Sequence, residues 1–151
     1  MKVALSLLVI AMVASCGQSS ASSPQIQASP TPERFGTATL SETACSFEMP
    51  DNLPLHEVSF SLVTRTRYTG HFGLIRIDNE HTYRELVDFW YGHNGLVAPS
   101  FSALVAETAV PPNSSGRLVA TVSLKATYAF HCGYNDDSGK VTGFFHELQA
   151  G

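Results

Sequence analysis

The chain has 151 residues, of which 44% are hydrophobic and 15% charged, and its formal net charge is −4. This length fits one ordinary domain and excludes a multidomain enzyme. The low charged content argues against solvated helical rods and long disordered tails. Lys and Arg are sparse and form no basic run, so we expect no nucleic-acid partner. A compact, strand-rich domain fits this composition best.

Residues 1–15 have the layout of a secretory signal peptide. Lys2 precedes an apolar run from Val3 to Val13, which is shorter than the ~20 residues that a membrane-spanning helix needs. The segment Val13–Cys16 resembles the lipobox of bacterial lipoproteins. This resemblance implies that Cys16 is acylated, becomes the first residue of the mature chain and anchors it to a membrane. An ordinary cleaved signal, with Cys16 merely near the cut, is the alternative.

Residues 16–34 follow as the lipidated Cys and a tether rich in Ser, Pro and Gln. Such a stretch cannot bury enough apolar surface to offset its chain entropy, so we expect it to be mobile. It would hold a single globular domain, residues 35–151, outside the cytoplasm. Gly17, rather than Asp, follows the Cys and favours the outer membrane or the cell surface over the inner membrane.

Two further cysteines, Cys45 and Cys132, form an even pair in an oxidising compartment, which predicts a disulfide. The alternative makes Cys132 a metal ligand. The stretch Tyr128–Cys132 has the pattern Tyr-x-Phe-x-Cys and resembles the last hairpin of a cupredoxin, where such a strand supplies the copper thiolate. A blue-copper site also needs a His shortly after the Cys and usually a Met beyond it. Asn135–Asp137 and Val141 occupy those places, so we predict no metal and no cofactor.

Hydrophobic alternation before the middle of the chain predicts strands at 35–40, 57–68 and 72–77, with a turn at Thr69–Gly70. One helix follows, because Tyr83, Leu86, Val87 and Trp90 recur at i, i+3, i+4 and i+7. Asp78–Glu80 supplies candidate N-caps, and Gly92 or Gly95 ends the helix.

Beyond the helix we predict strands at 101–110, 117–134 and 141–148, separated by turns at 111–116 and 135–140. Alternation in the long middle strand places Cys132 on the core side. Strands, one helix and then three strands predict an α+β fold. We expect a mainly antiparallel sheet of about five to six strands with the helix packed on one face.

Catalytic signals are weak. The chain has no motif for a nucleophilic Ser, and no two His residues have the spacing of a local metal site. Glu85, Asp88 and Glu107 leave acid-assisted glycoside hydrolysis open. We predict a non-catalytic protein, with an enzyme of unrecognised family or a carrier of a small apolar ligand as alternatives. The histidines considered are His56, His71, His81, His93, His131 and His146.

Aromatic residues on the predicted helix indicate a binding surface, because they exceed what one core-facing stripe can bury. With Tyr83 and Trp90 inward, Phe89 or Tyr91 is expected to be exposed. Arg and aromatic residues are enriched at interaction hot spots. The candidate patch therefore comprises Phe89, Trp90 and Tyr91, with Arg65 and Arg67 at its rim.

The order of elements from Thr69 to about Leu124 resembles the C-terminal domain of the small lipoprotein subunit of surface protease complexes, the PrcB type. The matching residues are Asp78–Trp90, Pro99–Ser102 and Ala103–Ala106. This resemblance implies a lipoprotein that binds and stabilises a partner at the cell surface. We therefore predict a membrane-anchored envelope lipoprotein that binds a protein or another envelope component.

Overall fold

The computed structural model describes residues 32–95 and 97–151. The predicted signal peptide, Cys16 and the tether up to residue 31 lie outside the described residues. Among the described residues, no helix is long and apolar enough to cross a membrane. The elements in chain order are β1 (Glu33–Leu40), β2 (Cys45–Glu48), β3 (Asn52–Leu53), β4 (Glu57–Thr64), β5 (Gly70–Ile77), α1 (Tyr83–Gly92), β6 (Ser102–Val110), β7 (Ser115–Thr121), β8 (Thr127–Asn135) and β9 (Val141–Ala150).

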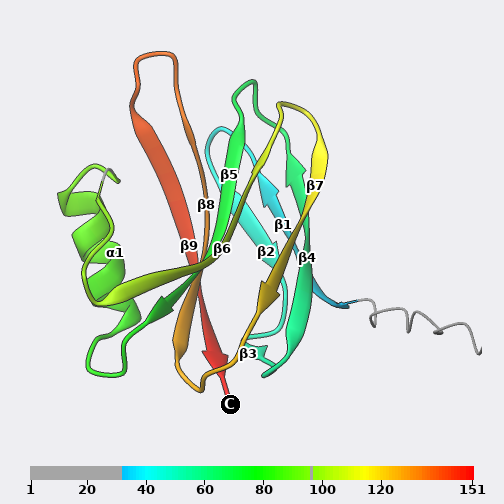
Figure 1. Cartoon of the computed structure of the whole chain (residues 1–151). Coiled ribbons are helices and arrows are strands. Elements are labelled where there is room, and N and C mark those ends of the chain that lie inside the picture. Colours follow the sequence, from blue (N-terminus) through cyan, green and yellow to red (C-terminus); the bar gives the residue numbers. More distant parts are fainter. Residues whose placement is uncertain (1–31, 96) are drawn as a thin grey trace, which may run out of the picture. The chain divides into compact units, whose positions relative to one another are not determined.

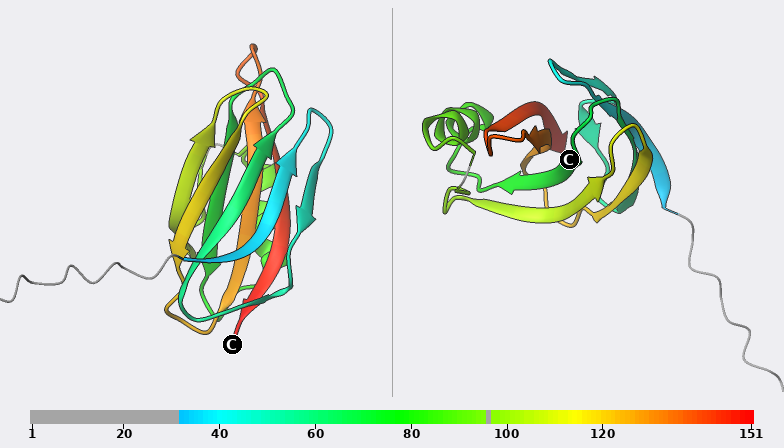
Figure 2. Two further views of the ribbon diagram at one scale, coloured as in Figure 1. Left: turned by 90° about the vertical axis from the view of Figure 1, so that its right-hand side faces the viewer. Right: turned by 90° about the horizontal axis from the view of Figure 1, so that it is seen from above.

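The strands form two sheets that face each other in a sandwich (Figures 1 and 2). One sheet has the order β2-β1-β4-β7 and the other β3-β9-β8-β5-β6. The pairs β1–β4 and β3–β9 are parallel, and the other pairs are antiparallel. Alternate residues of both sheets fill the space between them, and Leu40, Phe60, Phe72 and Phe130 are fully buried there. Ring centroids of Phe60 and Phe130 lie 4.7 Å apart across the two sheets.

The predicted α+β fold with a mainly antiparallel sheet is wrong: the domain is a two-sheet β-sandwich to which one short helix is added. The segment 117–134 explains the error. It contains β7 in one sheet and β8 in the other, joined by a crossing at 122–126. Both strands turn their apolar side chains toward the same core, as Leu118 and Phe130 do. The alternation of apolar and polar residues therefore continues through the crossing, and in the sequence it predicts a single strand.

Helix α1 packs on the outer face of the five-stranded sheet, where it lies beside β9 in Figure 1. Leu86 is its buried contact and joins Ile77 and Ala129 in a second, small core. The N-cap is Thr82 rather than the predicted Asp78–Glu80. Thr82 and Glu85 form a capping box in which the Thr82 Oγ1 accepts from the Glu85 N–H and the Glu85 carboxylate accepts from the Thr82 N–H.

Candidate functional site

The predicted disulfide is present, between Cys45 on β2 and Cys132 on β8. Its two Cα atoms lie 6.6 Å apart, and the bond joins the edge strand of one sheet to an interior strand of the other. Cys132 is fully buried in the sandwich core. Its sulfur is bonded to Cys45 and is not a free thiolate, so the residues present do not fit a copper site. Within residues 32–95 and 97–151, no three His, Cys, Asp or Glu side chains are grouped to hold a metal ion.

A row of four residues crosses the outer face of the five-stranded sheet, the face that α1 covers in part. His131 on β8 pairs with Phe145 on β9 and with Gly73 on β5, and Gly73 pairs in turn with Glu107 on β6. Gly73 has no side chain, so the row has a gap between the imidazole and the carboxylate. The sheet thus provides a backbone floor with a titratable group on each side of it.

Two more glycines lie in the next row, where Gly143 on β9 pairs with Gly133 on β8. A Cβ on Gly133 would lie 2.4 Å from the Thr142 carbonyl oxygen, and a Cβ on Gly143 would lie 3.0 Å from His131 Nε2. Neither position therefore has room for a side chain. These glycines leave space beside them for the Nε2 edge of the His131 ring.

Trp90 of α1 lies over this glycine pair. Its ring centroid is 4.7 Å from that of His131 and 5.2 Å from that of Phe145. The helix is fixed above Gly143 by a hydrogen bond of 3.1 Å that the Tyr91 hydroxyl donates to the Gly143 carbonyl oxygen. Trp90 is half-buried and borders the hollow in the sheet face.

Three cavities surround Trp90. The first, of about 340 Å³, lies toward Tyr91 and Lys140. The second and third, of about 250 and 170 Å³, are both lined by Trp90, Glu107 and His131. The smallest also has the apolar side chains of Ile75 and Leu104 in its wall. The helix and the sheet therefore form the two sides of an open cleft. Its walls contain both polar and apolar side chains, and it is large enough for a small molecule or one protruding side chain.

His131 is neutral at neutral pH. Burial, with the positive charge of His71 as a smaller cause, lowers the pKa of His131 to about 4. Its Nε2 atom is buried and has no hydrogen-bond partner among the described residues. A buried polar atom without a partner costs free energy, so its retention calls for an explanation.

Exposed apolar side chains lie in or next to the walls of the cleft. Tyr91 and Leu104 are each 59% exposed and Val97 is 53% exposed. Leu104 faces outward because β6 carries a bulge: Ala106 pairs with Leu74 and Leu104 with Ile75, which leaves Val105 as an extra residue. We refer to Trp90, Tyr91, Val97 and Leu104 as the Trp90 surface.

The predicted patch is brought together only in part. Trp90 and Tyr91 border the cleft, whereas Phe89 is half-buried and stacks on His93 with a centroid distance of 3.9 Å. Arg65 and Arg67 lie after the end of β4, in the loop that leads to β5, because this strand ends at Thr64 rather than at the predicted residue 68.

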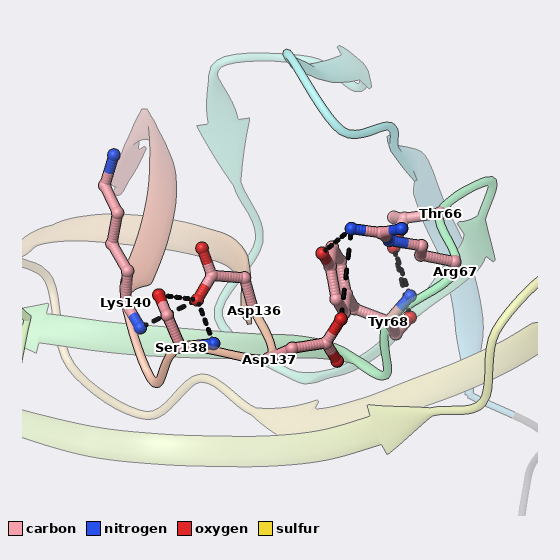
Figure 3. Close-up of polar contacts among 7 residues, drawn as sticks. All are labelled: Thr66, Arg67, Tyr68, Asp136, Asp137, Ser138 and Lys140. Atoms are coloured by element: carbon pink, nitrogen blue, oxygen red, sulfur yellow. Dashed lines mark hydrogen bonds and ion pairs between the residues drawn. The ribbon is translucent and has the colours of Figure 1, made fainter.

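Arg67 makes its contacts at that loop. Its guanidinium lies over the Tyr68 ring, 4.8 Å from the centroid, and 3.9 Å from the Asp137 carboxylate (Figure 3). The Tyr68 hydroxyl raises the pKa of Arg67 through a hydrogen bond. Within the described residues, no hydrogen bond or ion pair joins Arg65 or Arg67 to α1. Among the described residues, neither arginine lines the cavities around Trp90.

The three acids left open for glycoside hydrolysis are not assembled. Glu85 belongs to the helix cap and Asp88 lies 3.7 Å from Arg84 on α1, whereas Glu107 lies on β6. Sequence reasoning missed His131, Glu107 and the glycines as one site. The signal available was the outward face of β8, where Ala129, His131 and Gly133 alternate with the buried Phe130 and Cys132.

Comparison with solved structures finds similarity to auracyanin B, with a TM-score of 0.45 and 15% identity over 82% of this chain and 92% of that chain. Reduced auracyanin from the photosynthetic bacterium Roseiflexus castenholzii has a TM-score of 0.45 and 13% identity over 80% and 98%. A multi-copper oxidase from Pediococcus acidilactici has a TM-score of 0.39 and 11% identity over 85% of this chain and 28% of that chain. No protein-family model and no curated protein matches the sequence.

Proposed function

We propose that this protein is a non-catalytic envelope lipoprotein whose β-sandwich binds a protein partner through the Trp90 surface. The observation that carries the proposal is that exposed Tyr91 and Leu104 line cavities which the half-buried Trp90 also lines, with exposed Val97 next in sequence to Ala98 in the wall of one of them. Aromatic anchors in a pocket with apolar neighbours are the usual centre of a protein interface. Exposed apolar patches with polar residues around them commonly mark sites of protein interaction.

The anchor in this proposal is a lipid on Cys16, at the outer membrane or the cell surface. It is supported by the apolar run and the lipobox-like segment before Cys16. The disulfide between Cys45 and Cys132 adds support for a location outside the cytoplasm, because disulfides persist in oxidising compartments. Intact mass of protein purified from membranes would show loss of residues 1–15 and added acyl groups. A Cys16→Ala variant should leave the membrane fraction, and a wild-type protein of unacylated mass would refute the anchor.

The binding claim is tested by a pair of charge substitutions in the full chain. Leu104→Glu places a charge in the Trp90 surface, whereas Val119→Glu does so at a 41% exposed position on β7, in the other sheet. Affinity purification from native membranes should recover one stoichiometric partner with the wild type and the β7 variant, and lose it with the β6 variant. Equal recovery with both variants would refute the assignment of the surface.

A further inference from the structure

The hollow between Trp90 and Glu107 has the chemistry of a cation site. We propose that it binds an alkylammonium group, carried either by a small free amine or by the side chain of a lysine. The hollow shares Trp90 and Leu104 with the Trp90 surface, but the proposal is tested with small probes and does not depend on the protein partner above. The residues that carry it are Trp90, Glu107 and His131, which line both of the cavities of about 250 and 170 Å³.

Gly73 lines the smaller cavity and lies directly between His131 and Glu107 in the strand register, with Leu104 Cδ1 3.4 Å from where a Cβ on Gly73 would be. The Glu107 side chain is exposed, so its carboxylate keeps its water until a ligand arrives. The Trp90 ring borders the same space from the helix side. An ammonium group above Gly73 would therefore have a carboxylate on one side and an indole ring on another.

The charges around the hollow favour a cation. Glu107 is the single Asp, Glu, Lys or Arg among the described residues that line these two cavities, and His71 also lines the larger of them. A carboxylate strengthens hydrogen bonds from an ammonium group, and the face of an indole attracts a cation through its quadrupole. A carboxylic acid ligand would instead meet Glu107 with no Lys or Arg to offset the repulsion.

His131 completes the argument because it is neutral and unpartnered. Its low pKa removes a positive charge that would repel an ammonium group. Its buried Nε2 has no hydrogen-bond partner among the described residues, and it lies beside Gly133 and Gly143, so the ring presents no donor nitrogen fixed by another partner to the hollow. Ile75 and Leu104 in the wall provide contact for the methylene chain of the ligand.

The test uses the fluorescence of Trp90, the single tryptophan of the chain, with calorimetry in parallel on the full-length protein at neutral pH. The cationic probes are n-butylamine and Nα-acetyl-lysine methylamide, and 1-butanol and butyrate are the matched neutral and anionic probes. We expect saturable binding of both cations and none of the alcohol or the acid. A preference for the lysine derivative would identify a protein side chain as the source, and equal affinity would identify the alkylammonium group alone as sufficient.

Two variants distinguish a specific role of the Glu107 carboxylate from the general effect of removing one negative charge. Glu107→Gln should weaken binding of the cations about tenfold, because a charge-assisted hydrogen bond is lost. Glu147→Gln removes an exposed carboxylate from β9 and should leave binding unchanged. The proposal is overturned if butanol or butyrate binds as well as butylamine, if Glu107→Gln has no effect, or if neither fluorescence nor calorimetry detects binding.

Discussion

Gly143 lies directly beneath Trp90: a Cβ at this position would be 3.0 Å from the indole Nε1 and also 3.0 Å from Nε2 of His131. The helix reaches the sheet because no side chain separates them here. Gly143→Ala should therefore displace the indole ring, lower the free energy of unfolding by about 1–3 kcal/mol and shift the Trp90 emission to longer wavelength. Denaturant unfolding followed by fluorescence measures both effects.

Gly92→Ala is the matched control, since a Cβ at Gly92 has no atom within 4 Å. This substitution lies at the end of α1 and should be neutral or stabilising by up to about 1 kcal/mol. Equal destabilisation by the two substitutions would contradict the contact described for Gly143.

The disulfide should contribute a large share of the stability. It closes a loop with a sequence separation of 87 residues, for which the chain-entropy model gives about 4–5 kcal/mol. A Cys45→Ala, Cys132→Ala double variant should lose stability of this order, measured as the shift of the urea midpoint. Reduction of the wild type should lower its midpoint to a similar extent, whereas a reductant should leave the double variant unchanged. If full reduction of the disulfide left the urea midpoint of the wild type unchanged, the expected contribution of the disulfide would be contradicted.

Stability should depend on pH through His131. Its pKa is about 4 in the folded chain and about 6.5 when unfolded, so the unfolded state binds more protons between these values. Stability from this group therefore rises with pH from about 4 to 6.5 and is constant above that window. The full shift corresponds to about 3 kcal/mol.

Because other ionisable side chains, those of His71 and Glu107, line the same cavity as His131, the measurement is the difference between two stability curves, one for the wild type and one for His131→Phe. The difference in the free energy of unfolding between the two proteins should change between about pH 4 and 6.5 and be constant above that range. A difference that does not vary with pH would show that His131 is solvated in the folded state.

The helix cap should control the order of α1. Thr82→Ala removes the hydroxyl that accepts from the Glu85 N–H and should cost about 1 kcal/mol. Amide hydrogen exchange should rise first in the turn that begins at Tyr83, while the sandwich strands keep their protection. A uniform rise over the whole domain would mean that the helix and the sandwich unfold as one unit.

Local patterns predicted much of the secondary structure. The period of Tyr83, Leu86, Val87 and Trp90 predicted α1. The start of the helix differs from the prediction, because its N-cap is Thr82 in a capping box and not one of the residues Asp78–Glu80. The pairing of Cys45 with Cys132 was also predicted and is present. The helix depends on neighbours along the chain, and the disulfide follows from the two cysteines that remain once Cys16 is assigned to the lipid anchor.

The sandwich and the cleft depend on long-range pairing, which the sequence does not display. The parallel pairing of β1 with β4 and the crossing between β7 and β8 decide the fold class. His131 and Glu107 become neighbours only because β5 lies between β8 and β6, and the bulge at Val105 decides which residues of β6 face outward. Alternation assigns each residue to a face of its strand, but it does not identify the next strand.

The most direct measurement of the central claim is site-specific photocrosslinking in living cells of the native host. A benzophenone side chain replaces Leu104 in the Trp90 surface in one strain and Val119 on β7 in another, both in the full-length chain. One discrete crosslinked species should form from the β6 position and be lost when Tyr91→Glu is added, and none should form from the β7 position. Crosslinks of equal yield from both positions, or none from the β6 position, would contradict the claim that the Trp90 surface binds a protein partner.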